Sequence, residues 1–346
     1  MTWRQVRVGA AAITDRRYRK KTMRVLVTGG AGYIGSHTAK ALAATGHEVV
    51  VLDNFSGGHK WAIKWGPCVE GDIADTPLVA QALKTYGIDS VVHFAASIQV
   101  GESVRDPKKY FWNNVVGTLR LLDAMMEAGV PHIVFSSSAA VYGDPLKVPI
   151  PEDHPTRPVN PYGETKLIME SALKWYGGAY GIRWIALRYF NAAGADPGGE
   201  LGEDHEPESH LIPLVIRAAM GRIPFVEVFG TDYPSADGTA IRDYIHVTDL
   251  ADAHLKALEH LARGGESMAL NLGTGKGHTV REVIAAVERV AKIPVPARDA
   301  PRRAGDPPAL VADPAKAMSI LNWKPKFSGL DQIVESAWKW HNRNKE

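Results

Sequence analysis

The chain has 346 residues, of which 45% are hydrophobic and 23% charged, and this composition excludes disorder, collagen and coiled coil as its main state. With about 150 residues per domain as a guide, the length indicates one large domain or two modest ones. No run of about 18 apolar residues is present, so no membrane partner is expected. The single cysteine, Cys68, excludes an intrachain disulfide and a cysteine-based zinc site and fits a reducing, cytoplasmic location.

The charge is unevenly divided along the chain. Residues 1–22 carry seven basic residues and one acidic residue, a net charge of +6. Because the net charge of the whole chain is +2, residues 23–346 carry a net charge of −4. A basic nucleic-acid-binding face is therefore not expected. Residues 1–22 are either a disordered basic leader or the product of a start codon placed too early, and the second interpretation is favoured because Met23 opens the first expected strand. Val8–Ile13 is too short an apolar stretch for a signal peptide.

Short apolar runs alternate with segments of helical period through the first half. The runs predict strands at Arg24–Thr28, Glu48–Asp53, Ser90–Phe94, His132–Ser136 and Arg183–Tyr189, and the periodic segments predict helices at Gly32–Ala44, Lys108–Ala128 and Pro161–Tyr176. Continuously apolar strands between helices are typical of a parallel sheet covered on both faces. We therefore predict an α/β fold with a Rossmann-type doubly wound parallel sheet over residues 23–190.

The second half has a different texture. Ala192–Ser209 is rich in Gly, Pro and acidic residues and is expected to be loop, and Pro294–Pro308 is expected to be irregular. Helices are expected at His210–Gly221, Val247–Arg263, Val280–Lys292 and Leu330–Trp340. Residues 191–346 thus predict a smaller C-terminal α/β substrate domain, some segments of which rejoin the main sheet.

Thr28–Gly35 (TGGAGYIG) joins the first strand to the first helix. It satisfies G-x-G-x-x-G and also G-x-x-G-x-x-G through Gly29, Gly32 and Gly35. Glycine lets the backbone approach a pyrophosphate closely, and the helix N-terminus offers free N–H groups to the anion. Asp53 ends the second strand about twenty residues on, where a carboxylate accepts both ribose hydroxyls of NAD and repels the 2′-phosphate of NADP. The motif predicts NAD as cofactor.

Two further segments are expected along the same edge of the sheet. Gly71-Asp72-Ile73 is placed to contact adenine, although an isolated aspartate is more often a solvated turn residue. Phe94-Ala95-Ala96 follows the strand that begins at Ser90 and ends at the same edge.

Tyr162 and Lys166 form a Tyr-x-x-x-Lys pair near a helix start and so share one helix face. A free tyrosine has a pKa near 10, which makes it a poor base at pH 7. A neighbouring ammonium and a positively charged oxidised nicotinamide both favour the phenolate, and a shift of about three pKa units needs roughly 4 kcal/mol. Ser136-Ser137-Ser138 ends the preceding strand, so a serine hydroxyl is expected across the cofactor cleft.

Together these residues resemble the extended short-chain dehydrogenase/reductases, and the longer motifs resemble UDP-glucose 4-epimerases in particular. The similar segments are Arg24–Ala39 (RVLVTGGAGYIGSHTA), Val91–Phe94, Gly101–Val104, Phe135–Gly143 (FSSSAAVYG), Arg188–Gly194 (RYFNAAG), Arg242–Asp249 (RDYIHVTD) and Asn322-Trp323. Similar dehydratases carry Thr-Asp-Glu where this chain has Ser138, Ala139 and Ala140. Two alanines cannot supply the acid and base that elimination of water requires.

The resemblance implies inversion at C4 of a UDP-hexose by transient oxidation. The C4–H bond is not next to a carbonyl, so direct deprotonation is unreasonable. Tyr162, alone or with Ser138 as relay, takes the 4-hydroxyl proton, hydride passes to NAD, and it returns to the other face of the 4-ketose. The implied catalytic residues are Tyr162, Lys166 and Ser138. Because the hexose must rotate, the binding energy has to come from UDP.

The resemblance also implies a set of binding residues. For NAD these are Gly29, Gly32, Tyr33, Ile34, Gly35, Asp53, Asn54, Asp72, Ile73, Phe94, Ala95, Ala96, Asn113, Ser136, Tyr162, Lys166 and Phe190. For the UDP-hexose they are Ser138, Asn191, His210, Leu211, Phe229, Arg242, Arg303 and Asp306. Arginine suits a diphosphate because its guanidinium fork donates two parallel hydrogen bonds.

Further expectations concern the substrate, the alternative functions, the oligomeric state and the histidines. Leu310 stands where relatives restricted to glucose and galactose have tyrosine, so some tolerance of UDP-GlcNAc and UDP-GalNAc is a hypothesis. The alternative functions are epimerisation of a UDP-pentose or UDP-uronate, dehydration or decarboxylation, and a catalytically silent NAD-binding protein. A homodimer through helices Lys108–Ala128 and Pro161–Tyr176 is expected from the family. His93 and His246 are expected to be satisfied core histidines, and no metal site is predicted.

Overall fold

The computed structural model of the chain describes residues 22–303 and 306–343. The expected basic leader lies outside the described residues, apart from Thr22. Within the described residues, none of the helices combines the length and apolarity needed to cross a bilayer.

The main sheet has seven strands in the order β10-β6-β5-β4-β1-β2-β3, and every pair is parallel. The chain leaves β1 toward β2 on one side and later returns to β4 on the other, so the sheet is doubly wound and its strand order reverses between β1 and β4. The predicted Rossmann-type α/β fold is confirmed. The strands are β1 Arg24–Thr28, β2 Glu48–Asp53, β3 Cys68–Glu70, β4 Ser90–His93, β5 His132–Ser138, β6 Arg183–Tyr189 and β10 Met268–Leu272.

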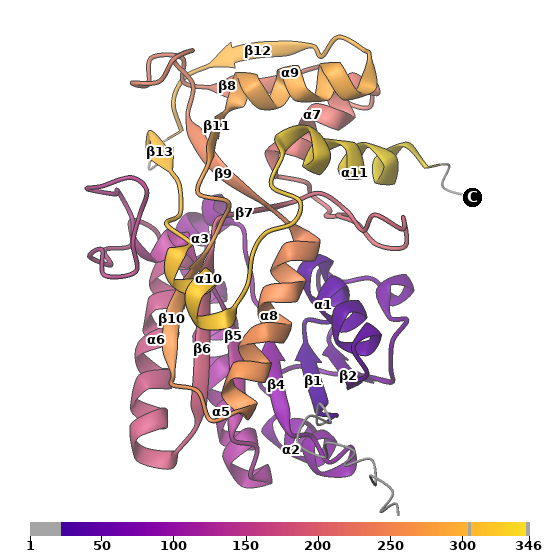
Figure 1. The fold of residues 1–346 in the computed structure, drawn as a ribbon, viewed down its shortest axis with the longest axis vertical. Coiled ribbons are helices and arrows are strands. Elements are labelled where there is room, and N and C mark those ends of the chain that lie inside the picture. The colour runs from indigo at the N-terminus through magenta and orange to yellow at the C-terminus, as the bar shows by residue number, and fades with distance from the viewer. Residues whose placement is uncertain (1–21, 304–305, 344–346) are drawn as a thin grey trace, which may run out of the picture.

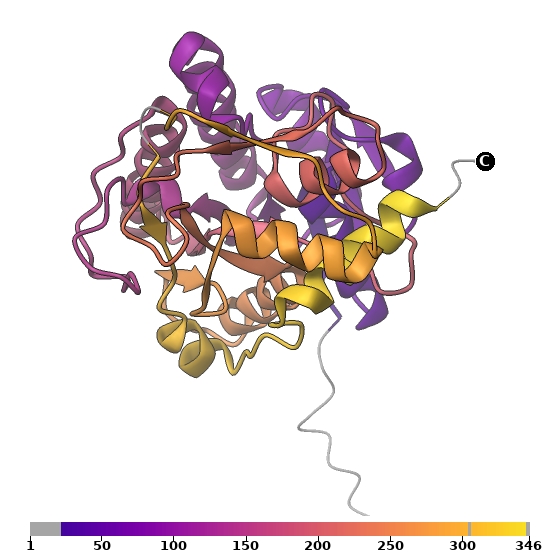
Figure 2. The same ribbon diagram turned by 90° about the horizontal axis from the view of Figure 1, so that it is seen from above.

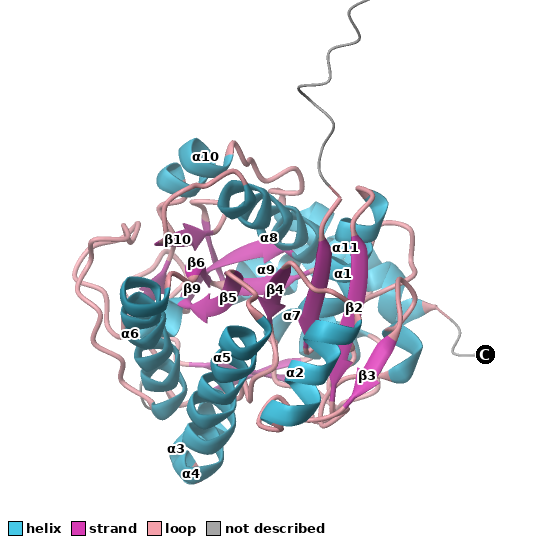
Figure 3. Ribbon diagram, turned by 90° about the horizontal axis from the view of Figure 1, so that it is seen from below, coloured by secondary structure: helices cyan, strands magenta, loops and turns pink. Residues whose placement is uncertain are grey.

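Helices cover both faces of this sheet (Figure 3). Alternate strand residues enter opposite cores: Val25 and Val27 belong to one buried cluster and Leu26 to the other. Both clusters consist mainly of buried aliphatic side chains, which explains why the strands read as continuous apolar runs. One face is covered by α1 Tyr33–Ala44, α8 Val247–Ala262 and α10 Ala315–Leu321, and the other by α2 Thr76–Thr85, α5 Gly117–Ala128 and α6 Pro161–Tyr180.

The expected helix at Lys108–Ala128 is helical throughout but changes type. It starts in α4, continues as a π-helical segment, η3, and ends as α5, which stops at the left-handed Gly129. π-Helical turns cluster at functional sites, and this one contains Asn113 and Asn114. The connecting elements of this half are η2 Lys60–Ala62, α3 Val100–Arg105, α4 Pro107–Tyr110, η3 Phe111–Val116 and η4 Ala139–Val141.

A second group of elements sits above the carboxyl edge of the main sheet (Figures 1 and 2). It has one sheet in the order β11-β9-β13, with β7 also pairing β9, and a two-stranded sheet of β12 and β8. A separate buried cluster holds β7, β8 and β9 against α7, α9 and α11. The elements are β7 Asn191–Ala193, α7 Leu211–Ala219, β8 Val226–Phe229, β9 Ile241–His246, β11 Gly277–Thr279, α9 Val280–Ala291, β12 Ala297–Ala300, β13 Ala309–Leu310 and α11 Leu330–Asn342.

Two loop predictions are wrong in part. Ala192 and Ala193 belong to β7, which pairs β9, and Ala297–Ala300 forms β12, which pairs β8. Strands of three or four residues are too short to show a period of two, and they exist here because a partner strand satisfies their backbone groups.

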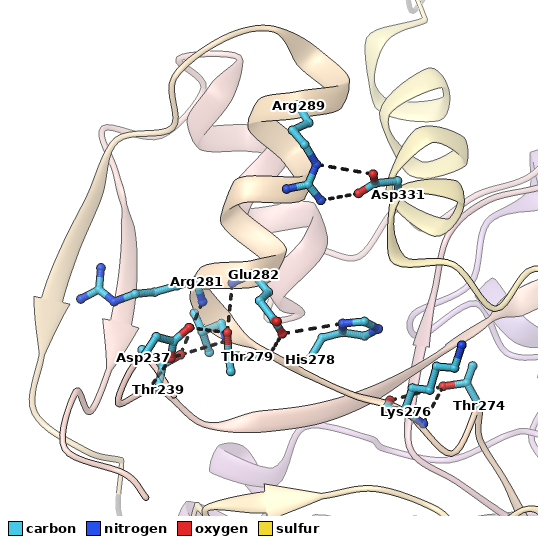
Figure 4. Close-up of polar contacts among 11 residues, drawn as sticks. Asp237, Thr239, Thr274, Lys276, His278, Thr279, Arg281, Glu282, Arg289 and Asp331 are labelled. Carbon is cyan, nitrogen blue, oxygen red and sulfur yellow. Dashed lines mark hydrogen bonds and ion pairs between the residues drawn. The ribbon is translucent and has the colours of Figure 1, made fainter. Parts of the chain in front are cut away.

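Helix α9 shows how local sequence sets an element boundary (Figure 4). The Thr279 hydroxyl accepts from the Glu282 backbone N–H at 3.1 Å, and the Glu282 carboxylate accepts from the Thr279 backbone N–H at 2.8 Å. This reciprocal capping box satisfies two N–H groups that have no partner inside the helix. Arg289, in the last turn of α9, pairs with Asp331 of α11 at 2.6 Å and joins the two helices.

Candidate active site at the carboxyl edge of the main sheet

The glycine-rich turn lies directly against the strand-order reversal. Gly29 has φ +69°, and a Cβ added to it would lie 2.6 Å from the Ala95 backbone nitrogen. A Cβ on Gly35 would collide with the Gly29 carbonyl oxygen. Neither position tolerates a side chain, so the turn keeps its backbone open toward the edge, where the first N–H groups of α1 have no helical partner. The turn fits a dinucleotide pyrophosphate.

Asp53 is held under this turn by the backbone. Its two carboxylate oxygens accept from the Ala31 N–H at 2.9 Å and the Phe55 N–H at 2.8 Å. Burial raises the pKa of Asp53, and these two hydrogen bonds oppose that rise. Each oxygen keeps a further lone pair, which suits the acceptance of ribose hydroxyls.

Of the residues expected near adenine, two have side chains that lie together and one has its side chain in the core. Asn54 donates to the Asp72 carboxylate at 2.9 Å, so these two predicted residues lie together at the ends of β2 and β3. The Ile73 side chain instead belongs to the buried core, facing Gly117 of α5. The Ile73 side chain therefore does not lie with those of Asn54 and Asp72.

The segment after β4 is anchored by a residue that the sequence reasoning missed. Asn114 is buried and bonds both backbone groups of Ser97, accepting from the N–H at 2.8 Å and donating to the carbonyl at 3.0 Å. Asn113, which was predicted, donates to the Asn114 side chain at 2.9 Å. The adjacent asparagines in an apolar helical segment were the available signal. Asn114 fixes the chain just after Phe94-Ala95-Ala96, beside Gly29.

Tyr162, Lys166 and Ser138 meet at the ends of α6 and β5. Asn160 caps α6 by accepting from the Gly163 N–H at 2.9 Å, which places Tyr162 in the first turn. The Lys166 ammonium lies 5.7 Å from the centre of the Tyr162 ring and donates to the Ser136 carbonyl at 2.9 Å. The Ser138 side chain is close enough to the Tyr162 phenol to lower its pKa. The structure thus brings the three expected catalytic residues together.

The protein environment alone opposes ionisation in this group. Burial raises the pKa of Tyr162, and the nearby Ser138 side chain partly offsets the rise. Burial also lowers the pKa of Lys166 to about 7. Both shifts favour the neutral forms of the tyrosine and the lysine. The protonation states of the two residues therefore respond strongly to any further charge in the cleft.

A buried ion pair holds α6 against the sheet behind the reacting groups. The Glu170 carboxylate accepts from Arg188 of β6 at 2.5 Å and from the Ser137 hydroxyl at 2.5 Å. Arg188 also donates to the Tyr142 hydroxyl at 2.9 Å. Tyr162, Lys166 and Glu170 are spaced by four residues along one face of α6, so this network fixes the rotation of the helix about its axis.

Four of the expected UDP-binding residues gather at the second group of elements. Asp306 accepts from Arg303 at 2.8 Å and lies 3.7 Å from an Arg242 nitrogen. The Arg303 guanidinium lies 4.9 Å from the centre of the Phe229 ring. Burial lowers the pKa of Arg242, while the Asp306 charge opposes that shift. Two guanidinium groups next to Asp306, one of them over an aromatic ring, suit a diphosphate next to a nucleoside.

Asn191 and Leu310 are placed by the strands that flank β9. Asn191 of β7 lies opposite Tyr244, and Leu310 of β13 lies opposite Arg242. Leu310 and Phe190 also pack against the apolar cluster that contains Ala139, the residue after Ser138. Leu310 therefore lies between Arg242 and the segment that follows Ser138.

His210 and Leu211 have other neighbours. His210 precedes α7, and its Nδ1 contacts the Glu203 carboxylate. Burial disfavours the His210 imidazolium, but Glu203 outweighs this effect and raises the pKa of His210. Leu211 packs against the core of the second group. Neither is joined to the Arg242 group by a direct contact among the described residues.

His93 and His246 are core histidines, as predicted. His93 contacts the Thr28 hydroxyl at 2.7 Å and the Thr118 hydroxyl at 2.8 Å, and burial lowers its pKa to about 3. His246 contacts Ser336 at 3.1 Å and accepts from the Thr248 N–H at 3.1 Å.

Known proteins with similar sequences and structures now decide the family. The sequence profile of the NAD dependent epimerase/dehydratase family matches residues 25–273. The UDP-glucose 4-epimerase of Halalkalibacterium halodurans is 53% identical over 322 residues, 93% of this chain and 96% of that protein. The crystal structure of UDP-glucose 4-epimerase from Brucella ovis in complex with NAD superposes with a TM-score of 0.90 at 53% identity and covers 92% of this chain and 98% of its own. The chain belongs to the NAD dependent epimerase/dehydratase family.

A third relative was solved with two ligands bound. The UDP-glucose 4-epimerase from Bifidobacterium longum, solved with NAD⁺ and UDP, has a TM-score of 0.88 at 40% identity and covers 93% of this chain and 98% of its own. The predicted resemblance is confirmed. In this chain Ala139 and Ala140 lie in η4, directly after Ser138, and carry no group able to act as acid or base.

Proposed function

We propose that the chain is a UDP-glucose 4-epimerase, which interconverts UDP-glucose and UDP-galactose with NAD as a tightly held cofactor. The observation that carries the proposal is the meeting of Tyr162, Ser138 and Lys166 at the edge where Gly29 approaches Ala95. The relatives named UDP-glucose 4-epimerase support it over their nearly full length. The cytoplasmic location stays a prediction from the single cysteine.

The glycine turn and Asp53 hold the pyrophosphate and the adenosine ribose of the cofactor in this proposal. The first turn of α1 binds the pyrophosphate through backbone N–H groups, and Asp53 accepts the ribose hydroxyls. Asn54 and Asp72 border the adenine. The remaining contacts come from Gly32, Tyr33, Ile34, Gly35, Ile73, Phe94, Ala95, Ala96, Asn113, Ser136 and Phe190.

When bound, NAD supplies reversible oxidation at C4 of the sugar. Tyr162 accepts the proton of the 4-hydroxyl and later gives it back, directly or through the nearby Ser138 hydroxyl. Lys166 favours the phenolate by its charge and is held in place by the Ser136 carbonyl. Ala139 and Ala140 leave the neighbouring carbon untouched, so no observation favours dehydration or decarboxylation.

The second group of elements binds the UDP moiety. Arg242 and Arg303 bind the diphosphate, Asp306 the ribose, and Phe229 and Leu211 border the nucleoside, with Asn191 completing the site. His210 was expected in this set, but it faces Glu203 and is left out of the proposal. UDP is held far from C4, which leaves the hexose free to turn. Leu310 borders the sugar and leaves room for an N-acetyl group, so UDP-GlcNAc and UDP-GalNAc are further substrates.

A homodimer accompanies this function. Large apolar side chains stand exposed on the two helices expected at the interface: Trp112 is 66% exposed on η3 and Trp175 is 74% exposed on α6. Apolar side chains this exposed on adjacent elements mark an interaction surface.

The test uses purified protein mixed with UDP-galactose without added NAD, with formation of UDP-glucose as the readout. We expect turnover, because the cofactor is retained through purification. Tyr162→Phe should lower kcat by at least about 100-fold, as expected for loss of an acid–base group, while bound NAD stays at the wild-type amount. Tyr176→Phe, on the same helix, is the matched control and should keep the wild-type rate. Near-normal turnover by Tyr162→Phe would show the base assignment to be wrong, and absence of UDP-glucose with the wild type would refute the function.

A further inference from the structure

The loop between β7 and α7 gathers four potential metal ligands that the epimerase chemistry does not use as a group. Glu203, His205, Glu208 and His210 each offer one ligand atom, and these atoms all lie within 4.8 Å of one another. The His205 Nδ1 is 3.1 Å from Glu203 and 3.9 Å from Glu208, and the His210 Nδ1 also contacts Glu203. Both imidazoles therefore direct their Nδ1 atoms toward the Glu203 carboxylate.

Glu208 points to a missing partner in this group. Its side chain is 0% exposed. One carboxylate oxygen accepts from the backbone N–H groups of Ser209 and His210, at 2.7 and 2.9 Å, but the other is buried without a hydrogen-bond partner among the described residues. A buried, unsatisfied carboxylate oxygen is costly. The oxygen that accepts these two N–H groups is also the one 3.9 Å from His205, so the other oxygen is acceptor capacity of Glu208 that the ion pairs do not use.

The donor set selects the class of cation. Two imidazole nitrogens and two carboxylate oxygens match zinc and similar divalent transition metals better than magnesium or calcium, which prefer oxygen ligands alone. Two carboxylates also balance the charge of a divalent ion. In a tetrahedral zinc site with bonds of about 2.1 Å the ligand atoms lie about 3.4 Å apart, so the present cluster needs only small side-chain movements to close.

The position of the cluster shows what an ion would hold together. The loop backbone is gripped from three sides: Trp340 of α11 donates to the Glu203 carbonyl at 2.9 Å, Arg217 of α7 donates to the His205 carbonyl at 3.2 Å, and His59 contacts the Asp204 carbonyl at 2.6 Å. The His205 ring also packs edge-on to Tyr33, in the first turn of α1, at 6.1 Å. The four side chains thus lie where the second group of elements meets the glycine turn.

We propose that Glu203, His205, Glu208 and His210 bind one divalent transition-metal ion, best matched by Zn²⁺, as a structural site that fastens the 203–210 loop between α1, α7 and α11. Four protein ligands complete a tetrahedral shell and leave no open position for substrate. The ion takes no part in the chemistry at C4. This site goes beyond the proposed function, and its existence does not depend on it.

The test uses the full chain, purified without a polyhistidine tag, stripped with a chelator and titrated with Zn²⁺ and, separately, with Co²⁺. We expect one ion per chain by elemental analysis after gel filtration, and a visible absorption of the Co²⁺ form typical of tetrahedral coordination. Zn²⁺ should raise the melting temperature of the stripped protein, because an ion that binds only the folded state stabilises it by mass action.

Two ligand variants and one control make the assignment specific. His205→Gln and Glu208→Gln should each weaken Zn²⁺ binding by more than about 10-fold and abolish the zinc-dependent rise in melting temperature. His59→Gln removes a contact to the same loop but no ligand, and it should bind one ion as the wild type does. Circular dichroism checks that each variant is folded. Failure of the stripped wild type to bind Zn²⁺, or wild-type affinity in both ligand variants, would overturn the proposal and leave an ion-pair cluster.

Discussion

Tyr162 and Lys166 illustrate what single residues contribute at this site. Four residues of helix place the ammonium 5.7 Å from the phenol ring, close enough for its charge to favour the phenolate. Burial opposes this, raising the pKa of Tyr162 and lowering that of Lys166. The pair is therefore poised by two opposing effects, and its protonation state is sensitive to a positive charge brought into the cleft.

The size of the Leu310 side chain is expected to decide which sugars fit the proposed site. Because Leu310 packs against the cluster that contains Ala139 and Phe190, a larger side chain there narrows the space for the sugar substituent at C2. Leu310→Tyr should lower kcat/KM for UDP-GlcNAc by at least about 10-fold and for UDP-galactose by less than about 3-fold. Leu310→Met conserves volume and is the control. Steady-state kinetics on both substrate pairs provide the measurement. Undetectable turnover of the acetylated pair by the wild type would reject the hypothesis of a permissive gate.

At the scale of elements, α6 is held in place by more than its apolar face. Glu170 and Arg188 are both buried, with side chains 7% and 8% exposed, and they join the helix to β6 while Ser137 joins it to β5. A buried pair of this kind adds less to stability than its geometry suggests, because both charges lose their hydration. Its value here is positional: it sets which face of α6 points at the cleft.

Glu170→Gln should lower the free energy of unfolding by about 3–5 kcal/mol, because the Arg188 charge is then left buried without a counter-charge. Glu127→Gln is the matched control, since Glu127 pairs with Lys84 on the surface where the side chains are 56% and 54% exposed. That change should cost no more than about 1 kcal/mol. Guanidinium unfolding of both variants at saturating NAD gives the comparison. Equal losses in the two variants would contradict the argument from burial.

In the whole molecule, the residues proposed to bind UDP lie on a different group of elements from the residues proposed to react with the sugar. The main sheet and its helices carry the glycine turn, Asp53 and the proposed catalytic residues, while the second group of elements, which carries Arg242, Arg303 and Asp306, lies above the same edge (Figure 1). The surface formed by η3 and α6 is left with exposed aromatic side chains, and a second copy of the chain would cover them.

Trp112→Glu tests this surface. A charge in place of a tryptophan that is 66% exposed should be harmless in a monomer but costly inside a dimer interface. We expect the wild type to sediment as a dimer and Trp112→Glu to dissociate at least about 10-fold more readily. Ile320→Glu is the control, because Ile320 is 40% exposed on α10, outside the expected interface. Sedimentation velocity over a range of concentrations gives the measurement. A wild type that is monomeric throughout would remove the dimer from the proposal.

The main sheet and its nucleotide-binding turn were predictable from sequence alone. β1, β2 and β6 have the predicted bounds, because strands buried on both faces must be continuously apolar and glycines that touch backbone cannot be replaced. Tyr162 and Lys166 share a helix face for an equally local reason. These features depend on neighbours close along the chain, so their pattern is visible before the chain is folded.

Long-range contacts were decided only by the tertiary structure. β7 and β12 are too short to carry a periodic pattern and exist through their partner strands. Asn114 reaches back to Ser97, and the Ile73 side chain turns into the core. Glu203, His205, Glu208 and His210 lie within eight residues of sequence, yet only the folded loop turns their ligand atoms toward one point. Side-chain direction in a loop depends on what the loop packs against, which local sequence does not specify.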